Sequence, residues 1–533
     1  MGLINRTWLN IWKGKPPGLA LLLINLLAAF AMVLPLIYVL SRAAAAPWEK
    51  WQILFRSRVP ILMWNTISLA VIVSLFTTIL GVILAWLIEH TDLPWKKYMR
   101  LLFTLPLVFP PYIGALTYII IFGKRGVMYS LVGSSIINVF SFFSVAFILS
   151  MFTFPYTYLT VSASLRKING NYEEAGRSCG ASYSSIFKRV MLPLVKPAIL
   201  SSSMIILFYI IADFGAVSML RYTTFTSSIY FQMVGKLDRS GASILSTLLI
   251  AFGFFVLALK AKLLKNNSFY QNPKSNRVMG PLKIGRFKPL AWLFILFVLL
   301  FSLVLPLTTL LIWSVKAIHQ GVVGIKTLYY MKNSLIISVG AAFITMSLSL
   351  PIAYMKYRRP SKITTVLNSF CHLGSIVPGI LLALGIVFII NKYLPWLVGG
   401  QAILIIGHSM RFLSRNIQSA ESSMALISPA LDETAFSLGK RFGTVLYKIV
   451  LPTISPGVLS GGAMVLVSSL KELPMTLMLR PPGFDTLSVR LWLSASDGFY
   501  INAAPSGLFI VLASIIPLYY LVKKEKVNEN GVS

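Results

Sequence analysis

Two acidic residues stand in or near long apolar runs, where a charge is costly. Asp213 and Glu472 each lie 20 residues after a proline, Pro193 and Pro452 respectively, which is about 30 Å along a helix. An ionisable side chain at such a depth is by default a candidate for a solute path or gate. The sequence therefore suggests two carboxylates that line a path or form an outer gate, facing each other and attracting a cation.

The same carboxylates have a structural alternative. Charged residues near helix ends commonly form ion pairs or reach the interface. Lys471 precedes Glu472, and Arg221 and Arg480 follow the two acids at matching distances. We favour the alternative, in which the acids pair with these bases to hold the helix ends. Asp213, Glu472, Arg221 and Arg480 are kept as candidate path or gate residues.

The residue patterns of an enzyme are missing from this sequence. It has no GxxxxGK[ST] phosphate loop, so the chain cannot itself be an ATPase. It also lacks an HExxH, a Ser/His/Asp or a paired-acid signature. The histidines and cysteines show no metal-ligand spacing, and we interpret them as structural residues: His90, His319, His372, His408, Cys179 and Cys371. We expect this chain to bind no metal and no cofactor.

Composition indicates a membrane protein. The 533 residues include 48 Lys and Arg against 15 Asp and Glu, a formal charge of +33. Yet 56% of residues are hydrophobic, only 12% are charged, and the mean hydropathy is +0.78. A soluble domain carries about twice that charged fraction. A disordered or nucleic-acid-binding chain would not be so apolar.

Apolar runs of about 20 residues predict transmembrane helices. Twelve candidates span approximately 18–41, 62–88, 101–123, 133–155, 196–219, 241–264, 290–315, 334–356, 367–391, 399–418, 455–479 and 501–522. Cytoplasmic loops are enriched in Lys and Arg, and with both termini inside about two thirds of the basic residues fall on the cytoplasmic side. The basic segment between spans six and seven is predicted to lie against anionic lipid headgroups, and it lacks the aromatics of a nucleic-acid site.

An internal repeat divides the chain into two halves. Matched positions lie 259 residues apart: Glu174 and Glu433, Ala175 and Thr434, Gly176 and Ala435, Gly180 and Gly439, Leu192 and Leu451, Pro193 and Pro452, Asp213 and Glu472, Arg221 and Arg480. Six crossings return the second half to the starting side, so the repeats are parallel. We predict an all-α integral membrane protein with a first half at 1–265, a basic cytoplasmic linker at 266–289 and a second half at 290–533.

The most regular part of the repeat is a polar loop at about 160–193 and 419–452. Acidic residues stand where a helix would begin, Glu174 in the first copy and Glu433 in the second, and a glycine can end or bend that helix. A basic amphipathic stretch and a Leu-Pro pair follow. This order predicts a short helix on the cytoplasmic membrane surface, closed by proline. A simple connector between two spans is the structural alternative, but a connector need not keep its spacing in both copies.

The repeated pattern resembles the EAA motif, Glu-Ala-Ala-x3-Gly-x9-Ile-x-Leu-Pro, of bacterial ABC importer permeases. This chain departs from it modestly, with Gly176, Thr434 and Val190 in place of two alanines and the isoleucine. The resemblance covers most of both halves. It implies a type I importer permease in the bacterial cell membrane, and coupling residues that contact an ATPase: Glu174, Ala175, Gly180, Leu192, Pro193, Glu433, Ala435, Gly439, Leu451 and Pro452.

Further segments are similar to fused two-half permeases of the ferric-iron type. They run from Ala212 to Thr226 and from Lys471 to Leu487. The similarity implies an iron(III) importer fed by an extracytoplasmic binding protein and driven by two copies of an ATPase that bind ATP and Mg. Fused thiamine and aminophosphonate permeases are also similar, so these solutes are alternatives.

Two other classes of protein are rivals. An ion-coupled secondary transporter also uses parallel repeats, but it predicts ionisable residues near the bilayer midplane, and we find the midspan stretches nearly free of them. An intramembrane enzyme would need a nucleophile or metal constellation. Co-purification with an ATPase would distinguish the importer from both.

Overall fold

The computed structural model describes residues 17–124, 126–134, 137–264 and 282–530. These residues form helices and their connections without a β-strand. The first half contains α2 (Leu19–Ala44), α3 (Trp48–Ser57), α4 (Val59–His90), α5 (Lys96–Leu102), α6 (Pro111–Phe122), α7 (Val127–Val132), α8 (Phe142–Arg166), α9 (Asn171–Ser178), α10 (Tyr183–Ile186), α11 (Leu192–Ala212), α12 (Gly215–Met219), α13 (Phe225–Tyr230) and α14 (Arg239–Leu264).

The second half repeats this order. It contains α15 (Lys288–Leu299), α16 (Leu305–His319), α17 (Ile325–Arg358), α18 (Lys362–Cys371), α19 (Leu373–Ile376), α20 (Gly379–Tyr393), α21 (Gln401–Met424), α22 (Pro429–Ser437), α23 (Phe442–Val445), α24 (Leu451–Leu470), α25 (Pro474–Leu479), α26 (Leu487–Ser496) and α27 (Tyr500–Asn530). Short π-helical turns precede α11 and α24, at Phe187–Met191 and Leu446–Val450.

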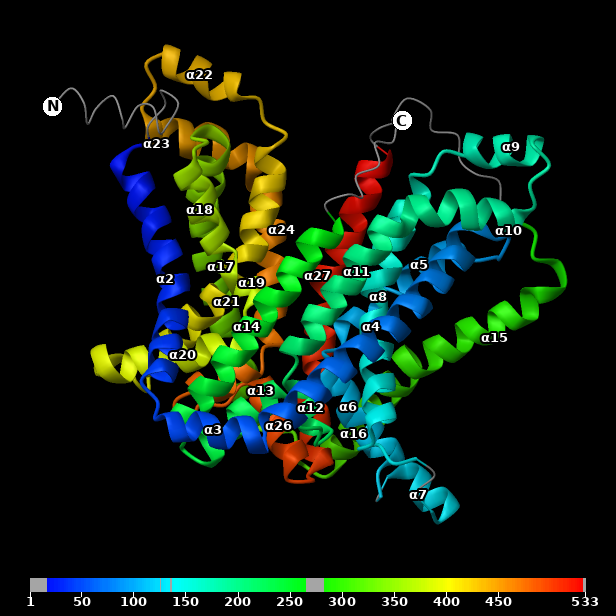
Figure 1. Ribbon diagram of the computed structural model, residues 1–533, viewed down its shortest axis with the longest axis horizontal. Coiled ribbons are helices and arrows are strands. Elements are labelled where there is room, and N and C mark those ends of the chain that lie inside the picture. Colours follow the sequence, from blue (N-terminus) through cyan, green and yellow to red (C-terminus); the bar gives the residue numbers. More distant parts are fainter. Residues whose placement is uncertain (1–16, 125, 135–136, 265–281, 531–533) are drawn as a thin grey trace.

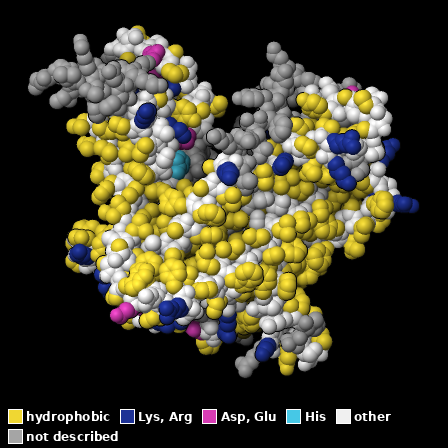
Figure 2. All heavy atoms as spheres, viewed as in Figure 1, with side chains coloured by type: hydrophobic (Ala, Val, Ile, Leu, Met, Phe, Trp, Pro, Cys, Tyr) yellow, Lys and Arg dark blue, Asp and Glu magenta, His cyan; other side chains and the backbone are white. Residues whose placement is uncertain are grey.

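Nine helices in the described part of the chain are long and apolar enough to cross a membrane, and a bent pair makes a tenth. The pair joins Lys362–Ile376 to Gly379–Tyr393 at 108°. Two predicted spans fall outside this count. Helix α21 is too polar, with Arg411 and Arg415 near its middle, and the apolar part of α27 that is described, Tyr500–Ile515, is short. Hydrophobic side chains cover the middle of the surface in Figure 2, as lipid contact requires.

Several predicted spans are interrupted where glycine or proline occurs. The run at 101–123 is broken, because α5 ends at Leu102 and α6 begins only at Pro111. The runs at 196–219 and 455–479 are each broken near their outer ends, where short helices begin at Gly215 and Pro474. Proline lacks the backbone N–H that a continuing helix needs. The breaks in the runs at 196–219 and 455–479 turn the chain next to Asp213 and Glu472.

The two repeated loops lie at one end of the molecule. In Figure 1, α9 and α22 are at the top, at the same end as the start of α2, whereas α3, α12, α13 and α26 are at the opposite end. The breaks after α11 and α24 therefore lie far from the loops, as the spacing along the helices predicts. We call the end with α9 and α22 the loop end, and the other the outer end.

The first helices of the two halves are exchanged. Helix α2 packs against α17, α18 and α20 of the second half, and α16 packs against α6 of the first half as well as α27. A Cβ atom added at Gly385 of α20 would lie 2.6 Å from Cβ of Pro35 in α2, so glycine permits this close approach. The halves are interlocked, because each buries an element of the other.

The described end of the predicted linker is fixed to the first half. Residues 265–281 lie outside the described part. Leu282 and Thr91 form an isolated bridge, and Asp92 lies 2.7 Å from Nζ of Lys288. The hydrogen bond from Lys288 and one from the backbone of Ile284 lower the pKa of Asp92. The chain thus enters α15 from a point attached to the loop after α4.

Candidate functional site

The two repeated loops have the same backbone structure. Helices α9 and α22 each end one residue before a glycine-containing turn, and Gly180 and Gly439 both have φ of 74°. The backbone N–H of Gly180 donates to Arg177, and that of Gly439 donates to Phe436, both at 2.9 Å. A Cβ atom at either glycine would meet no other atom within 4 Å. Each glycine is therefore needed for its left-handed backbone conformation and not for room.

The proline does not close a separate surface helix, as the sequence suggested. Helix α10 continues through a π-helical turn into α11, and α23 continues in the same way into α24. Pro193 and Pro452 lie in the first turn of α11 and α24. A proline ring clashes with the carbonyl four residues earlier, and the wider π turn relieves that clash. The loop is thereby joined to its span by one continuous helix.

The loop surfaces are accessible at the loop end. Glu174 and Glu433 are exposed, as are Gly180, Gly439 and Leu192, whereas Leu451 is half-buried. The second loop adds large exposed apolar side chains, with Leu426 88% and Leu438 73% exposed. An apolar surface of this kind is typical of a protein contact site.

The second loop is held by a buried ion pair. Arg358, at the end of α17, donates from Nε to Oδ2 of Asp432 at 2.6 Å. The same guanidinium donates to the backbone oxygens of Ile427 and Ser428. Both charged side chains are less than one tenth exposed. Helix α22 is therefore fixed to α17, and its residue Ala435 is buried, whereas Ala175 in the first loop is exposed.

At the outer end, the two candidate carboxylates cap helices. Oδ2 of Asp213 accepts the backbone N–H groups of Ala216 and Val217, both at 3.1 Å, at the start of α12. Oε1 of Glu472 accepts the N–H of Met475 at 3.4 Å, at the start of α25. These bonds satisfy donors that a broken span would otherwise leave without partners.

The favoured pairing of these acids with neighbouring bases is wrong. Within the described residues neither carboxylate has an ion-pair partner. Arg480 pairs with Asp485, and the guanidinium of Arg221 lies 5.4 Å from the ring centre of Phe140. The bases at the outer end thus have other partners, and backbone N–H groups take their place at the acids.

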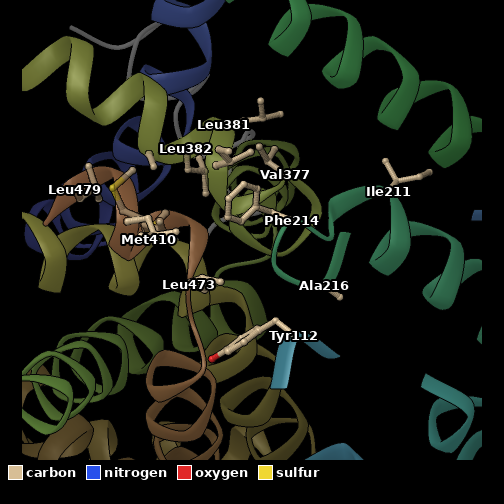
Figure 3. Packing of buried hydrophobic residues seen from close by; sticks show 14 of the residues in the cluster. Tyr112, Ile211, Phe214, Ala216, Val377, Leu381, Leu382, Met410, Leu473 and Leu479 are labelled. Atoms are coloured by element: carbon tan, nitrogen blue, oxygen red, sulfur yellow. The ribbon is translucent and has the colours of Figure 1, made fainter. Parts of the chain in front are cut away.

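An apolar contact between the halves follows the two acids. Phe214 and Leu473 are matched by the 259-residue offset and are 1% and 0% exposed. In Figure 3, Phe214 lies beside Val377 and Leu382 of the second half, and Tyr112 lies near Leu473. The hydroxyl of Tyr112 donates to the backbone oxygen of Lys471 at 3.2 Å. We call Tyr112, Phe214, Val377, Leu382 and Leu473 the outer closure.

The molecule is hollowed at the other end. Figure 2 shows a notch in the surface between the part that carries α22 and the part that carries α9. The chain is therefore closed between its halves at the outer end and divided at the loop end. A path that opens to alternate sides is expected to have this arrangement in one of its states.

Sequence reasoning missed two arginines that join Lys471 in a group of basic residues on the second half. Arg411 and Arg415 lie one turn apart on α21, and Lys471 follows α24. Arg411 donates to the backbone oxygens of Gly374 and Val377, and Arg415 donates to the hydroxyl of Ser468. The signal was present in the predicted tenth span, where two arginines at a spacing of four share one helix face.

Two of the remaining candidates for chemistry, His408 and His372, form structural hydrogen bonds. The ring of His408 contacts the hydroxyls of Ser469 at 2.6 Å and Thr476 at 3.0 Å. His372 contacts the hydroxyl of Ser414 at 2.8 Å. No cluster of His, Cys, Asp or Glu in the described ranges could hold a metal ion. For these two histidines the structural interpretation is confirmed.

Comparison with known proteins gives a consistent result. The family model for a binding-protein-dependent transport system inner membrane component matches twice, at residues 77–267 and 346–523. An Fe(3+)-transport system permease protein of Haemophilus influenzae is 29% identical over 96% of this chain and 99% of its own length. A ferric transport system permease protein of Actinobacillus pleuropneumoniae is 23% identical over 94% of this chain and 77% of its own. A probable sulfate transport system permease protein of Chlorokybus atmophyticus is 29% identical, but it covers 43% of this chain and 82% of its own length.

The buried ion pair at the second loop generates a prediction. Asp432→Asn leaves Arg358 buried without a counter-charge, and breaking a buried pair in this way costs about 3 kcal/mol. We expect faster proteolysis within 425–445 of the purified full chain and a lower unfolding midpoint. The double variant Arg358→Met with Asp432→Leu removes both charges and should be closer to wild type. An Asp432→Asn variant as resistant as wild type would show that the pair does not hold α22.

Proposed function

The chain belongs to the family of binding-protein-dependent transport system inner membrane components, and from this premise we propose that it is the permease of an ATP-driven importer for iron(III). In this proposal the chain itself catalyses no reaction. Two copies of a separate ATPase bind ATP and Mg, and a binding protein delivers the solute at the outer end. The loop end then faces the cytoplasm, with both termini. The membrane-spanning helices and the repeated family match support a multi-pass permease.

One observation carries the proposed mechanism. In each half a single helix runs from the loop to the outer closure: α10 continues into α11 and reaches Asp213 and Phe214, and α23 continues into α24 and reaches Glu472 and Leu473. A helix is stiff over this length, so movement of a loop also moves the residues that close the outer end.

The exposed loops are the proposed contact with the ATPase. When ATP draws the two ATPase copies together, α9 and α22 approach each other, and the notch at the loop end closes. The same rotation separates Phe214 from Val377 and Leu382, so the path opens at the outer end and admits the solute. Hydrolysis reverses the movement. The interlocked helices α2 and α16 keep the halves together during this rocking.

The assignment of iron(III) as the solute is supported by how much of this chain its ferric relatives match. The two ferric relatives match more than nine tenths of this chain, including both halves, whereas the sulfate relative matches less than half of it. Family membership favours the ATP-driven importer over an ion-coupled secondary transporter. Thiamine and aminophosphonates are retained as control solutes.

Solute-stimulated ATP hydrolysis tests this assignment. The assembled complex of this chain, its ATPase and its binding protein is reconstituted in lipid. We expect hydrolysis to rise several-fold when the binding protein is loaded with iron(III), and iron to enter the vesicles with ATP. Thiamine, an aminophosphonate and sulfate should have no effect. Stimulation by one of these control solutes and not by iron would contradict the iron assignment.

The two loop glycines provide a test of coupling. Because both have positive φ, Gly180→Val with Gly439→Val should distort the turns and uncouple ATP hydrolysis from uptake, while the protein still inserts. Gly180→Asn with Gly439→Asn is the matched control, since asparagine tolerates this conformation. We expect roughly tenfold less iron moved per ATP in the valine variant, for a turn strained by about 1–2 kcal/mol at each site. Normal coupling in that variant would refute the proposed role of the turns.

A further inference from the structure

The centre of the molecule has a basic wall on one half only. Arg415 is exposed near the middle of α21 and about 14 Å from its loop end. It lies close enough to Tyr156 and Tyr209 of the first half to interact with both. Lys471, on the same half, is near enough to Arg415 for their charges to interact. Two cations of the second half and two phenols of the first half thus lie near one another.

This arrangement is a departure from the repeat. The 259-residue offset pairs Arg415 with Tyr156 and Ser468 with Tyr209. The two pairs are also equivalent in space, because Arg415 donates to Ser468, and the rings of Tyr156 and Tyr209 lie 5.8 Å apart. One pseudo-symmetric contact is therefore aromatic in the first half and basic in the second. If these side chains only held the helices together, both halves would need the same kind of residue. The difference therefore points to a role toward something that lies between the halves.

The charges of the group are not neutralised by ion pairs. Arg415 donates to a hydroxyl, and Lys471 donates to the backbone oxygen of Leu107 at 3.1 Å. The third cation, Arg411, donates hydrogen bonds to backbone carbonyl oxygens at the bend between α19 and α20. The nearby carboxylates, Asp213 and Glu472, are engaged by backbone N–H groups. Glu472 is close enough to Arg411 and Arg415 for their charges to interact, but among the described residues none of these three side chains forms an ion pair.

Arg415 is exposed and has no ion-pair partner among the described residues, so its charge is available to a negatively charged ligand. Guanidinium and ammonium groups bind oxyanions and carboxylates, and phenol hydroxyls add hydrogen bonds to the same oxygens. A bare ferric ion would be repelled by Arg415 and Lys471. Ferric ion that keeps oxygen ligands of an anion presents negative oxygens to these groups.

We propose that Arg415 and Lys471, with Tyr156 and Tyr209, form an anion station in the path, and that iron(III) crosses together with a bound oxyanion or carboxylate. This inference rests on the proposed function. Arg415 is the residue that contacts the anion directly, because it is the exposed member of the group. Ser468 positions it.

Charge reversal at Arg415 tests the proposal in the assembled transporter. Iron uptake into vesicles is measured with radioactive iron supplied with radiolabelled citrate or phosphate. We expect the anion to enter with the iron. Arg415→Gln should lower the uptake of both by about tenfold, because a charge contact of this kind contributes about 1.4 kcal/mol or more. Arg415→Glu should abolish the uptake of both. Arg415→Lys should keep much of the uptake. Ser468→Ala keeps the charge and removes only the hydrogen-bond acceptor of Arg415, so it should lower uptake less than Arg415→Gln does.

The outcomes separate this inference from the proposed function. Undiminished iron uptake by an inserted Arg415→Glu variant, or iron that enters without either anion, would overturn the anion station while leaving the iron importer intact. The purified full chain provides a second readout, by equilibrium dialysis with radiolabelled phosphate. Retention of phosphate that Arg415→Glu abolishes supports the station. If the chain retains phosphate in this way but the assembled transporter moves no iron, the iron assignment fails and the station stands.

Discussion

A helix that is interrupted inside a membrane must find partners for its terminal N–H groups, and this constraint organises the chain. At both interruptions near the outer end the partner is a carboxylate one or two residues after the span, Asp213 or Glu472. The capped break lets the chain turn inward there. The next residues, Phe214 and Leu473, consequently lie between the halves and close the outer end. The position of the closure along the path is thus set by where two backbone breaks can be satisfied.

The two halves share the same backbone elements and differ in the side chains that these elements carry. The turns at Gly180 and Gly439, the π-helical turns before Pro193 and Pro452, and the capped breaks are repeated element by element. The side chains that face the space between the halves are not. A single fused chain permits this, because each half can change independently, whereas a symmetric dimer would place the same residue on both walls.

Much of the framework could be predicted from the sequence, because it follows local rules. Apolar runs predicted most of the spans, and the 259-residue repeat predicted the loops and the helix-ending role of Gly180. The predictions failed where the structure depends on tertiary contacts. The partners of Asp213 and Glu472 depend on where the chain turns after a break. Helix α21 is too polar for a span by composition, yet most of its residues are buried among other helices. Arg415 lies in the predicted tenth span, and only the packing of the halves brings it near Tyr156 and Tyr209.

The central claim is that the loops and the outer closure move together as rigid units. Cys179 and Leu438 are matched by the repeat and are both exposed beside the loop turns, so they suit a distance measurement by spin labelling. The labelled chain carries Leu438→Cys and has Cys371 replaced by serine. In the assembled complex we predict that a non-hydrolysable ATP analogue shortens the distance between the two labels and that ADP restores it. An unchanged distance in a complex that still transports would contradict the account.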